Sequence, residues 1–392
     1  MSTKAKVIGV NMVKFSKPGA NEPYEVMAAK AVKGALEDAG IDYSEIEQAY
    51  ASYVYGDSTC GQTALYLVGM SGIPIINVNN NCSSGSTALF MARQAVESGA
   101  VECALAVGFE EMKPGALGSV WNDRTPPMGW AVERLNELQP ELPDAPLALK
   151  LFGAGGKAYI EKYGADPAIF AKVSVKTRSH AIHNPYSLFD KPLTVEEVMN
   201  APIMFPYLTR LMACPPTCGA AAAIVCSEQF ARRHGITNAV EIVAQAMTTD
   251  TGVTHDDPIN LIGADMTRRA AQQVYAKAGI GPEEVNVVEL HDCFTPNEVI
   301  TYEGLGLCEA GEAQKLIHDR NNTYGGKYVV NPSGGLMSKG HPLGATGLAQ
   351  CTELVWQLRG QADKRQVEGA QVALQHNLGL GGACVVTMYR KG

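Results

Sequence analysis

Four short segments place cysteine or histidine beside glycine and other small residues, where these side chains can do chemistry. Cys82 stands in NNNCSSGS, directly before small residues that begin a predicted helix. A sulfur at a helix N-terminus meets the positive end of the helix dipole and free backbone N–H groups, which lower the pKa of a thiol. A buried structural cysteine is the ordinary alternative. The bend, the helix start and a similarly placed histidine favour a nucleophile.

That histidine is His341, in SKGHPLGATG. Glycines on both sides permit a sharp backbone path, and Pro342 favours the start of a helix. A histidine held there can take the proton of Cys82 or donate a hydrogen bond to a developing oxyanion. The motif alone leaves a helix-capping role open as the alternative.

A third segment, VVELHDCFTPNE, puts three reactive side chains in a row at the end of a predicted buried strand. Adjacent strand residues point to opposite faces, so His291, Asp292 and Cys293 cannot converge without a loop. We therefore expect His291 and Cys293 to take part in the chemistry and Asp292 to be structural.

The fourth segment, QHNLGLGGACVV, predicts a strand that passes through glycines into another strand. Backbone N–H groups of such glycines can approach a substrate oxygen closely. His376 is a further candidate for lining the site. The glycine pattern lacks the spacing and the following helix of a dinucleotide-binding motif.

A duplicated framework is expected to position these segments. Residues 24–52 read as an amphipathic helix, a turn and a half-buried strand, and a second copy starts at Ala270, with residues 278–280 opposite residues 39–41. Setting Cys82 against His341 aligns the two segments that follow. The alternation of helices and strands favours layered α/β halves with helices packed on sheets.

The region 114–212 differs in character, with many prolines and irregular spacing. We interpret it as an insertion with helices of its own that covers the site. The expected organisation is a first half made of residues 1–113 and 213–265, the inserted domain 114–212, and a second half of residues 266–392.

Length, net charge and the absence of targeting patterns argue against several classes of function. The chain has 392 residues, more than one hydrophobic core of ~250–300 residues holds. Its formal net charge of −8 argues against nucleic-acid or anionic-membrane binding, and no run approaches the ~20 apolar residues of a membrane span. The start lacks a secretory pattern, and the end, MYRKG, lacks a peroxisomal SKL-type signal. We expect a cytoplasmic, bacterial protein.

Ten cysteines are dispersed along the chain, which fits reduced, buried residues rather than a disulfide framework. Cys214 and Cys218 come closest to a metal-binding spacing. No second Cys or His pair lies nearby in the sequence to complete four ligands, so no metal site is expected.

Together and in this order, the four motifs resemble those of the thiolase superfamily, specifically thiolases of the sterol carrier protein type. NNNCSSGS matches the nucleophile motif, HDCF stands in place of NEAF of conventional thiolases, GHPLGATG matches the catalytic-histidine motif, and HNLGLGG replaces CxGxG. The resemblance covers essentially the whole chain. It implies two duplicated α/β halves in a five-layered αβαβα sandwich with an inserted loop domain, assembled as at least a dimer.

The resemblance also implies roles for single residues. Cys82 would be the acylated nucleophile and His341 the group that activates it. Cys293 would move the proton at the substrate α-carbon, because the terminal motif has His376 where conventional thiolases have a cysteine.

Two oxyanion holes follow from the same resemblance. His291 and His341 would form one of them. The backbone N–H groups of Cys82 and Gly379 would form the other.

The implied reaction is ping-pong acyl transfer between 3-ketoacyl-CoA or acyl-CoA and coenzyme A, with CoA as substrate and no permanently bound cofactor. Because the net charge is −8, the CoA phosphates need local cations, and the insertion offers candidates. They are Arg178, His180, His183, Lys191 and Arg210.

Two alternatives remain. A ketosynthase-like condensing enzyme would use two histidines beside its cysteine, which Cys293 argues against because such enzymes need no second cysteine. A noncatalytic subunit that binds a hydratase or aldolase would not need to retain all of the reactive groups. The sequence does not specify acyl chain length or branching.

Overall fold

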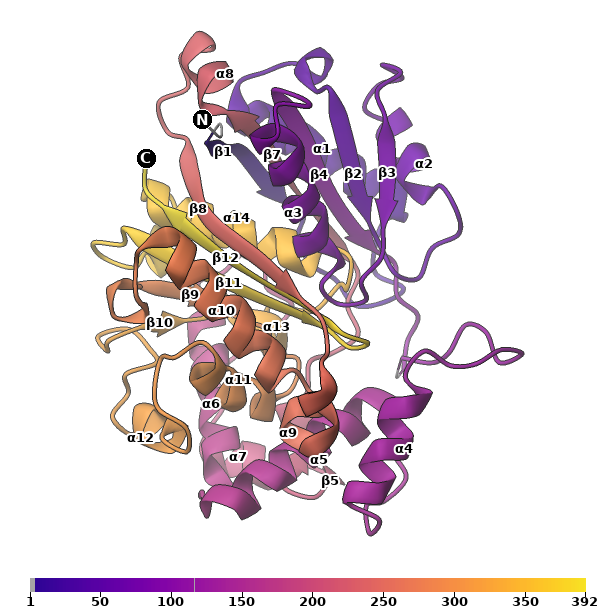
Figure 1. Cartoon of the computed structure of the whole chain (residues 1–392), viewed down its shortest axis with the longest axis vertical. Helices are drawn as coiled ribbons and strands as arrows, with labels where there is room; N and C mark the ends of the chain where they lie inside the picture. The colour runs from indigo at the N-terminus through magenta and orange to yellow at the C-terminus, as the bar shows by residue number, and fades with distance from the viewer. Residues whose placement is uncertain (1–3, 116) are drawn as a thin grey trace.

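The computed structural model describes residues 4–115 and 117–392 (Figure 1). The first half of the chain forms five strands: β1 (Ala5–Met12), β2 (Gln48–Ser52), β3 (Ile75–Val78), β4 (Cys103–Glu110) and β7 (Gly219–Ser227). Their order in the sheet is β1-β7-β4-β2-β3. Strand β2 is parallel to β3 and β4, and β7 is antiparallel to β4 and β1. β4 and β7 are buried along their whole length, as expected for strands covered on both faces.

The second half repeats this arrangement. Its strands are β8 (Val240–Thr248), β9 (Val287–Glu289), β10 (Val329–Val330), β11 (Val372–Gly379) and β12 (Ala383–Arg390). Their order is β8-β12-β11-β9-β10, with the same parallel and antiparallel neighbours as in the first half. Pairing of β1 with β8 joins both halves into one ten-stranded sheet. The expected duplication is therefore visible in the topology.

Strand β8 has the position in the second half that β1 has in the first. We therefore propose that the halves divide between β7 and β8, earlier than the boundary at residue 265 expected from the sequence. The helices agree with this division. Both α1 (Tyr24–Ala39) and α10 (Ala264–Ala278) end at a left-handed glycine, Gly40 with φ 67° and Gly279 with φ 65°. Matching helix ends explain the alignment of residues 39–41 with 278–280.

Helices form the other three layers. α1 and α2 (Cys60–Tyr66) cover the outer face of the first-half strands, and α10 and α11 (Thr295–Gly304) cover the outer face of the second-half strands. Between the two halves of the sheet lie α3 (Ser84–Glu97) and α14 (Thr346–Arg359). α14 is buried almost all round, as expected for a helix between two sheets. These are the five layers of an αβαβα sandwich.

The inserted region does contain helices of its own. They are α4 (Gly129–Leu138), α5 (Leu147–Tyr163), α6 (Ala168–Ala181) and α7 (Val195–Met199), with a small two-stranded sheet of β5 (Ile203–Phe205) and β6 (Leu208–Thr209). This region packs against the second half (Figure 1), where Phe152 of α5 stacks on Phe294 with ring centroids 5.3 Å apart. It therefore abuts the segment that follows Cys293.

Short elements complete the chain. The remaining α-helices are α8 (Glu228–Arg233), α9 (Pro258–Leu261), α12 (Ala313–His318) and α13 (Gly335–Ser338). The 3-10 helices are Tyr43–Glu45, Arg210–Met212, Gly252–Asp256, Pro282–Glu284 and Asp363–Arg365. Among the described residues, none of the helices combines the length and the apolar character that crossing a membrane would require.

Candidate active site

Cys82 lies between β3 and α3, two residues before the helix begins at Ser84. Asn81 before it has a left-handed backbone with φ 51°, a conformation that asparagine tolerates better than most residues. The Asn81 side chain donates to the carbonyl of Leu380 over 3.0 Å. The nucleophile candidate is therefore at a helix N-terminus, as expected, and is fixed to the turn between β11 and β12.

Three of the predicted reactive groups meet at one point. The sulfur of Cys82 and one ring nitrogen each of His291 and His341 lie within 4.8 Å of one another. The two imidazole rings are perpendicular, at 86°, with centroids 4.9 Å apart. All three side chains are buried. Such a trio can combine a nucleophile, a base and a hydrogen-bond donor.

Glycines let the two central helices bring Cys82 and His341 together. A Cβ on Gly85 would lie 2.9 Å from the carbonyl oxygen of Gly344, and a Cβ on Gly347 would lie 2.3 Å from the backbone nitrogen of Ser86. Because real Cβ atoms do not approach so closely, both positions require glycine. These glycines belong to the two motifs that carry Cys82 and His341.

His341 is oriented by the first residue of α14. Its Nδ1 lies 2.7 Å from Oγ1 of Thr346, and that hydroxyl is 3.0 Å from the carbonyl of Pro342. Its Nε2 is buried without a hydrogen-bond partner among the described residues. Burial lowers the pKa of His341 to about 3, so the ring is neutral and can accept a proton. The expected helix start at Pro342 is wrong, because α14 begins at Thr346 and Pro342 lies in the preceding turn.

The expected lowering of the Cys82 pKa is also wrong. Burial, followed by the nearby carboxyl of Glu110, raises this pKa to about 12, although the N–H groups of Cys82 and Leu380 hydrogen-bond to the sulfur and act in the opposite direction. The resting group is a thiol beside a neutral imidazole. A base must therefore remove the proton during the reaction.

This protonation state predicts the pH dependence of Cys82 alkylation. Below its pKa a thiol gains about tenfold in thiolate for each pH unit, so iodoacetamide labelling should accelerate continuously from roughly pH 6 to pH 9. Peptide mapping by mass spectrometry follows the rate. The urea-unfolded chain is the control and should level off near the ordinary thiol pKa of ~8.5. A rate that is already constant at neutral pH would indicate a preformed thiolate and contradict this assignment.

Cys293 follows β9 and is buried with two other cysteines nearby. Burial, followed by the charges of Cys214 and Cys82, raises its pKa well above the ordinary value. At neutral pH Cys293 is thus a thiol that can donate a proton. Its neighbour Asp292 accepts from the N–H of Leu336 over 2.7 Å, at the N-terminal turn of α13, which is a structural contact.

The chain that returns from the insertion runs between the loops that carry Cys293 and His341. Ala213 pairs with Phe294, Pro216 pairs with His341, and the N–H of Cys214 donates to the carbonyl of Cys293 over 2.8 Å. Sequence reasoning considered Cys214 only for its spacing to Cys218. It missed its position beside Cys293, because nothing local in the sequence pairs residues so far apart.

His376 does not project toward Cys82. Its Nε2 lies 2.9 Å from Oγ1 of Thr267 in α10, and its Nδ1 accepts from the backbone N–H of His291 over 3.4 Å. The next residue, Asn377, points to the opposite face of β11 and donates to the carbonyl of Cys82. The expectation that His376 lines the site is therefore corrected. Side chains alternate between the two faces of a strand, so Asn377 could have been predicted to face Cys82 once the inner face of β11 was known.

Gly379, the expected N–H donor of the second oxyanion hole, serves a different purpose. A Cβ there would lie 2.2 Å from the carbonyl oxygen of Asn80, so glycine allows the β11–β12 turn to approach the Cys82 loop. The N–H from this turn that reaches the sulfur belongs to Leu380. We assign the donor role to Leu380 accordingly.

Glu110, at the end of β4, was also missed by sequence reasoning. Its carboxylate accepts from the N–H groups of Val54, Tyr55 and Gly344, and burial raises its pKa to about 7. It thereby ties the end of the first-half sheet to the His341 loop.

The five cations proposed for CoA differ in their surroundings. His180 is buried, with Nδ1 2.9 Å from the carbonyl of Asn331 and Nε2 2.7 Å from Oγ1 of Thr323, and burial lowers its pKa to about 3. A neutral, fully engaged histidine is unsuited to bind phosphate, so this expectation is wrong. Arg178 is half-buried over the ring of Phe189, 4.1 Å from its centroid.

The other three cations are exposed. They are His183, Lys191 and Arg210.

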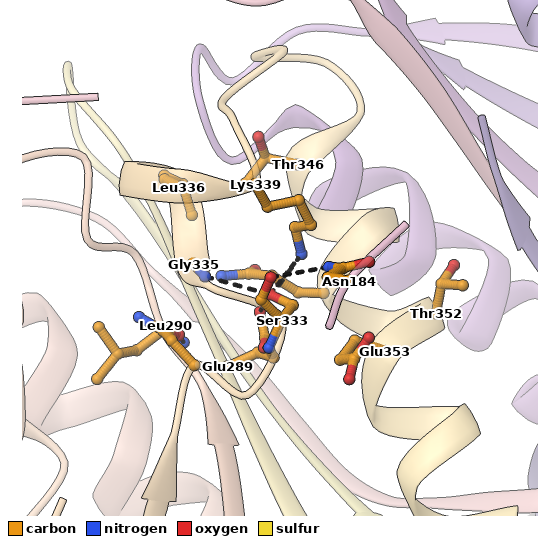
Figure 2. A network of polar contacts seen from close by, with 12 residues as sticks. Asn184, Glu289, Leu290, Ser333, Gly335, Leu336, Lys339, Thr346, Thr352 and Glu353 are labelled. Carbon is orange, nitrogen blue, oxygen red and sulfur yellow. Dashed lines mark hydrogen bonds and ion pairs between the residues drawn. The ribbon is translucent and has the colours of Figure 1, made fainter. Parts of the chain in front are cut away.

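A buried polar network links the loops that carry His291 and His341 (Figure 2). Lys339 lies 3.5 Å from the carboxylate of Glu289 and donates to Oγ of Ser333 over 2.9 Å. Ser333 donates to Glu289 over 2.8 Å, and Asn184 donates to the carbonyl of Ser333 over 2.8 Å. Glu289 stands two residues before His291, and Lys339 stands two residues before His341. The network therefore holds both loops in a fixed relation.

Removing one charge of this pair should destabilise the fold strongly. Lys339→Met leaves Glu289 as an uncompensated buried carboxylate, which typically costs about 3–5 kcal/mol. Urea denaturation measures the free energy of unfolding of each variant. Lys315→Met, which breaks an exposed pair with Asp319, is the matched control and should change it by no more than about 1 kcal/mol. The double variant Glu289→Gln/Lys339→Met should recover much of the loss. Equal effects of Lys339→Met and Lys315→Met would contradict this.

Family models match nearly the whole chain. The model described as "Thiolase, N-terminal domain" matches residues 6–229, and the model described as "Thiolase C-terminal domain-like" matches residues 233–389. The two matches meet ahead of β8, where we divide the halves.

Curated relatives match over the same length. The chain is 54% identical to "Sterol carrier protein 2" of Rattus norvegicus over 98% of this chain and 72% of that protein. It is 34% identical to "Acetyl-CoA acetyltransferase" of Methanothermobacter thermautotrophicus over 98% of this chain and 99% of that protein.

Solved structures share the fold. "Ltp2-ChsH2(DUF35) aldolase" superposes with a TM-score of 0.84 at 22% identity, covering 100% of this chain and 98% of the other. "Crystal structure of human mitochondrial 3-ketoacyl-CoA thiolase in complex with CoA" superposes with a TM-score of 0.73 at 17% identity, covering 100% and 98%. The motifs, the duplicated five-layered fold and the matches over the full length lead to one conclusion: the chain belongs to the thiolase family.

Proposed function

We propose that this protein is a CoA-dependent thiolase that cleaves 3-ketoacyl-CoA, or in reverse condenses acyl-CoA with acetyl-CoA, through an acyl group carried on Cys82. The observation that supports it most is the convergence of Cys82, His291 and His341 within 4.8 Å. A thiol, a neutral base and a hydrogen-bond donor are the groups that acyl transfer to sulfur requires.

In the cleavage direction, Nε2 of His341 takes the proton of Cys82 while the sulfur attacks the 3-keto carbon. The N–H groups of Cys82 and Leu380 donate hydrogen bonds to the oxyanion that forms. The bond between carbons 2 and 3 then breaks, and His291 donates a hydrogen bond to the oxygen of the departing acetyl-CoA enolate. The enolate carbon takes the thiol proton of Cys293.

The second half-reaction restores every group. Coenzyme A gives its thiol proton to the Cys293 thiolate and attacks the acyl group on Cys82. The N–H groups of Cys82 and Leu380 stabilise the thioester oxyanion. Cys82 leaves as thiolate and recovers its proton from His341, so protons and charges balance over the cycle.

The proposal includes a homo-oligomer, at least a dimer, joined through the first-half sheet. Strand β3 is at the edge of the ten-stranded sheet. The adjoining region exposes Tyr66, Leu67 and Met70 by 50%, 48% and 78%. Sedimentation measures the mass in solution, and a monomer would contradict this part.

A panel of CoA thioesters tests the reaction. Acetoacetyl-CoA and medium-chain, 2-methyl-branched and steroid side-chain 3-ketoacyl-CoA should each be assayed for loss of the 3-keto thioester with and without CoA. We expect cleavage that requires CoA for at least one substrate class. The donor types of the Cys82 trio also suit zinc, so the assay should be repeated with EDTA, which should leave the rate unchanged. Loss of activity with EDTA would assign the trio to a metal instead.

Two other functions would give different results. A partner-dependent aldolase, the kind of enzyme that the name of one fold relative describes, would cleave a carbon–carbon bond without CoA and without an acyl group on Cys82. A ketosynthase-like enzyme would condense after decarboxylating a malonyl thioester.

We propose that the exposed cations of the insertion, together with Arg178, bind the phosphates of CoA. Arg178→Glu and Arg210→Glu should each raise the KM for CoA by about tenfold, the effect of losing one charge-assisted contact, with little change in Cys82 acylation. Steady-state kinetics at varied CoA measures this. Arg232→Glu, at an exposed position of α8, is the control. An unchanged KM in both variants would remove the insertion from CoA binding.

A further inference from the structure

Asn377 of β11 is fully buried between the nucleophile loop and His291. Its Nδ2 donates to the carbonyl of Cys82 over 3.1 Å and lies 3.1 Å from Nδ1 of His291. One side-chain amide therefore contacts both loops, and nothing in its local sequence indicated such a role.

The contacts fix the orientation of this amide. A carbonyl oxygen can only accept, so the NH₂ group and not Oδ1 must face Cys82. If the amide were flipped, Oδ1 would face the carbonyl oxygen of Cys82, and two acceptors would be in contact. Oδ1 is buried without a partner among the described residues, so this orientation is kept although the oxygen is left unpaired.

That orientation determines the tautomer of His291. The amide NH₂ can only donate, so Nδ1 of His291 must be an acceptor, and in a neutral ring the proton then lies on Nε2. Burial, followed by His341 and His376, lowers the pKa of His291 well below the ordinary value, so the ring is neutral. Nε2–H is therefore the group that His291 offers to a ligand.

His341 is held in the opposite tautomer. The Thr346 hydroxyl has one proton, which it donates to the carbonyl of Pro342 over 3.0 Å. Its oxygen is then an acceptor for Nδ1–H of His341 at 2.7 Å. The Nε2 of His341 is left as a bare base.

We propose that Asn377 is a positioning residue that holds His291 as its Nε2–H tautomer, so that His291 can donate to the substrate oxyanion while His341 acts as the base. This inference rests on the proposed acyl transfer for its function, but the tautomer itself does not. The two histidines thus have different roles because a carboxamide orients one and a hydroxyl orients the other.

Asn377→Asp tests this with almost no change in shape. A carboxylate only accepts, so it should draw the proton of His291 onto Nδ1 and leave Nε2 without a hydrogen. The full-length protein labelled with ¹⁵N-histidine reports this directly, and His291→Gln identifies the His291 signals. We expect Nδ1 to be unprotonated in the parent protein and protonated in Asn377→Asp. Thr346→Val is the matched variant and should perturb the signals of His341 and not those of His291.

Two reactions separate positioning from a general structural role. Exchange of the α-protons of acetyl-CoA passes through the enolate oxyanion to which His291 donates, and it should slow by about 10²–10³-fold in Asn377→Asp, with little change in KM. Alkylation of Cys82 by iodoacetamide forms no oxyanion and should fall much less, because the new carboxylate acts on it only through the pKa of Cys82.

Three outcomes would overturn the proposal: an Nδ1–H ring in the parent spectrum, unchanged α-proton exchange, or an equal fall of both reactions. The parent spectrum decides the tautomer even if Asn377→Asp does not fold. If the parent protein forms no acyl-enzyme at all, the proposed function fails while the tautomer result stands.

Discussion

Replacing Cys82 with alanine should reduce CoA-dependent cleavage of a 3-ketoacyl-CoA by at least about 10⁴-fold, as expected when a catalytic nucleophile is removed. Among the described residues, Cys82 is the cysteine whose sulfur lies within 4.8 Å of a ring nitrogen of both His291 and His341. Cys293 lies in the loop after β9, and burial raises its pKa well above the ordinary value. The loss should appear in kcat and in kcat/KM, measured by the decrease of the 3-keto thioester.

The matched control for this variant is Cys60→Ala. Cys60 is likewise buried in the first half, at the start of α2, and has no role in the proposed chemistry. It should keep activity near that of the parent protein. If Cys82→Ala retains activity within about tenfold of the parent, the nucleophile is another residue.

Replacing Cys293 with serine should separate the two halves of the chemistry. The hydroxyl keeps the size of the side chain but is a far weaker acid than a thiol. Thiolysis and exchange of the α-protons of acetyl-CoA with solvent should each fall by about 10²–10⁴-fold, the typical contribution of a general acid or base. Acylation of Cys82 by acetyl-CoA should fall much less, because Cys293 only protonates the departing CoA thiolate in that step. Exchange is measured by mass spectrometry in D₂O.

His376→Ala provides the comparison. His376 hydrogen-bonds Thr267 and the backbone of His291 and does not face Cys82, so we expect a much milder loss. If Cys293→Ser exchanges α-protons at the parent rate and His376→Ala does not, the roles assigned to these two residues are reversed.

Much of the fold could be predicted because its signals are local. The glycines that end α1 and α10 mark the same position in both halves, and the apolar runs of β4 and β7 indicate strands covered on both faces. The division that we propose between β7 and β8 differs from the boundary expected at residue 265 because it rests on the pairing of β8 with β1 and β12, and strand pairing is a property of the tertiary structure.

The site was predictable where residue type and helix position suffice. Cys82 at the start of α3 and His341 ahead of α14 follow from their motifs, and the structure brings both to His291.

Properties that depend on burial were not predictable from the motifs. The helix terminus alone suggested a low pKa for Cys82, but desolvation dominates. His180 looked like a surface cation and is an engaged core residue. Choosing His376 over Asn377 required knowing which face of β11 meets the nucleophile loop.

Whether Cys82 carries the acyl group is tested most directly by mass spectrometry of the protein mixed with acetyl-CoA or a 3-ketoacyl-CoA and quenched in acid. We predict that the intact mass increases by one acyl group, that digestion places this group on the peptide containing Cys82, and that added CoA removes it. An adduct on Cys293 or Cys214, or cleavage that proceeds with no adduct on Cys82, would contradict the mechanism.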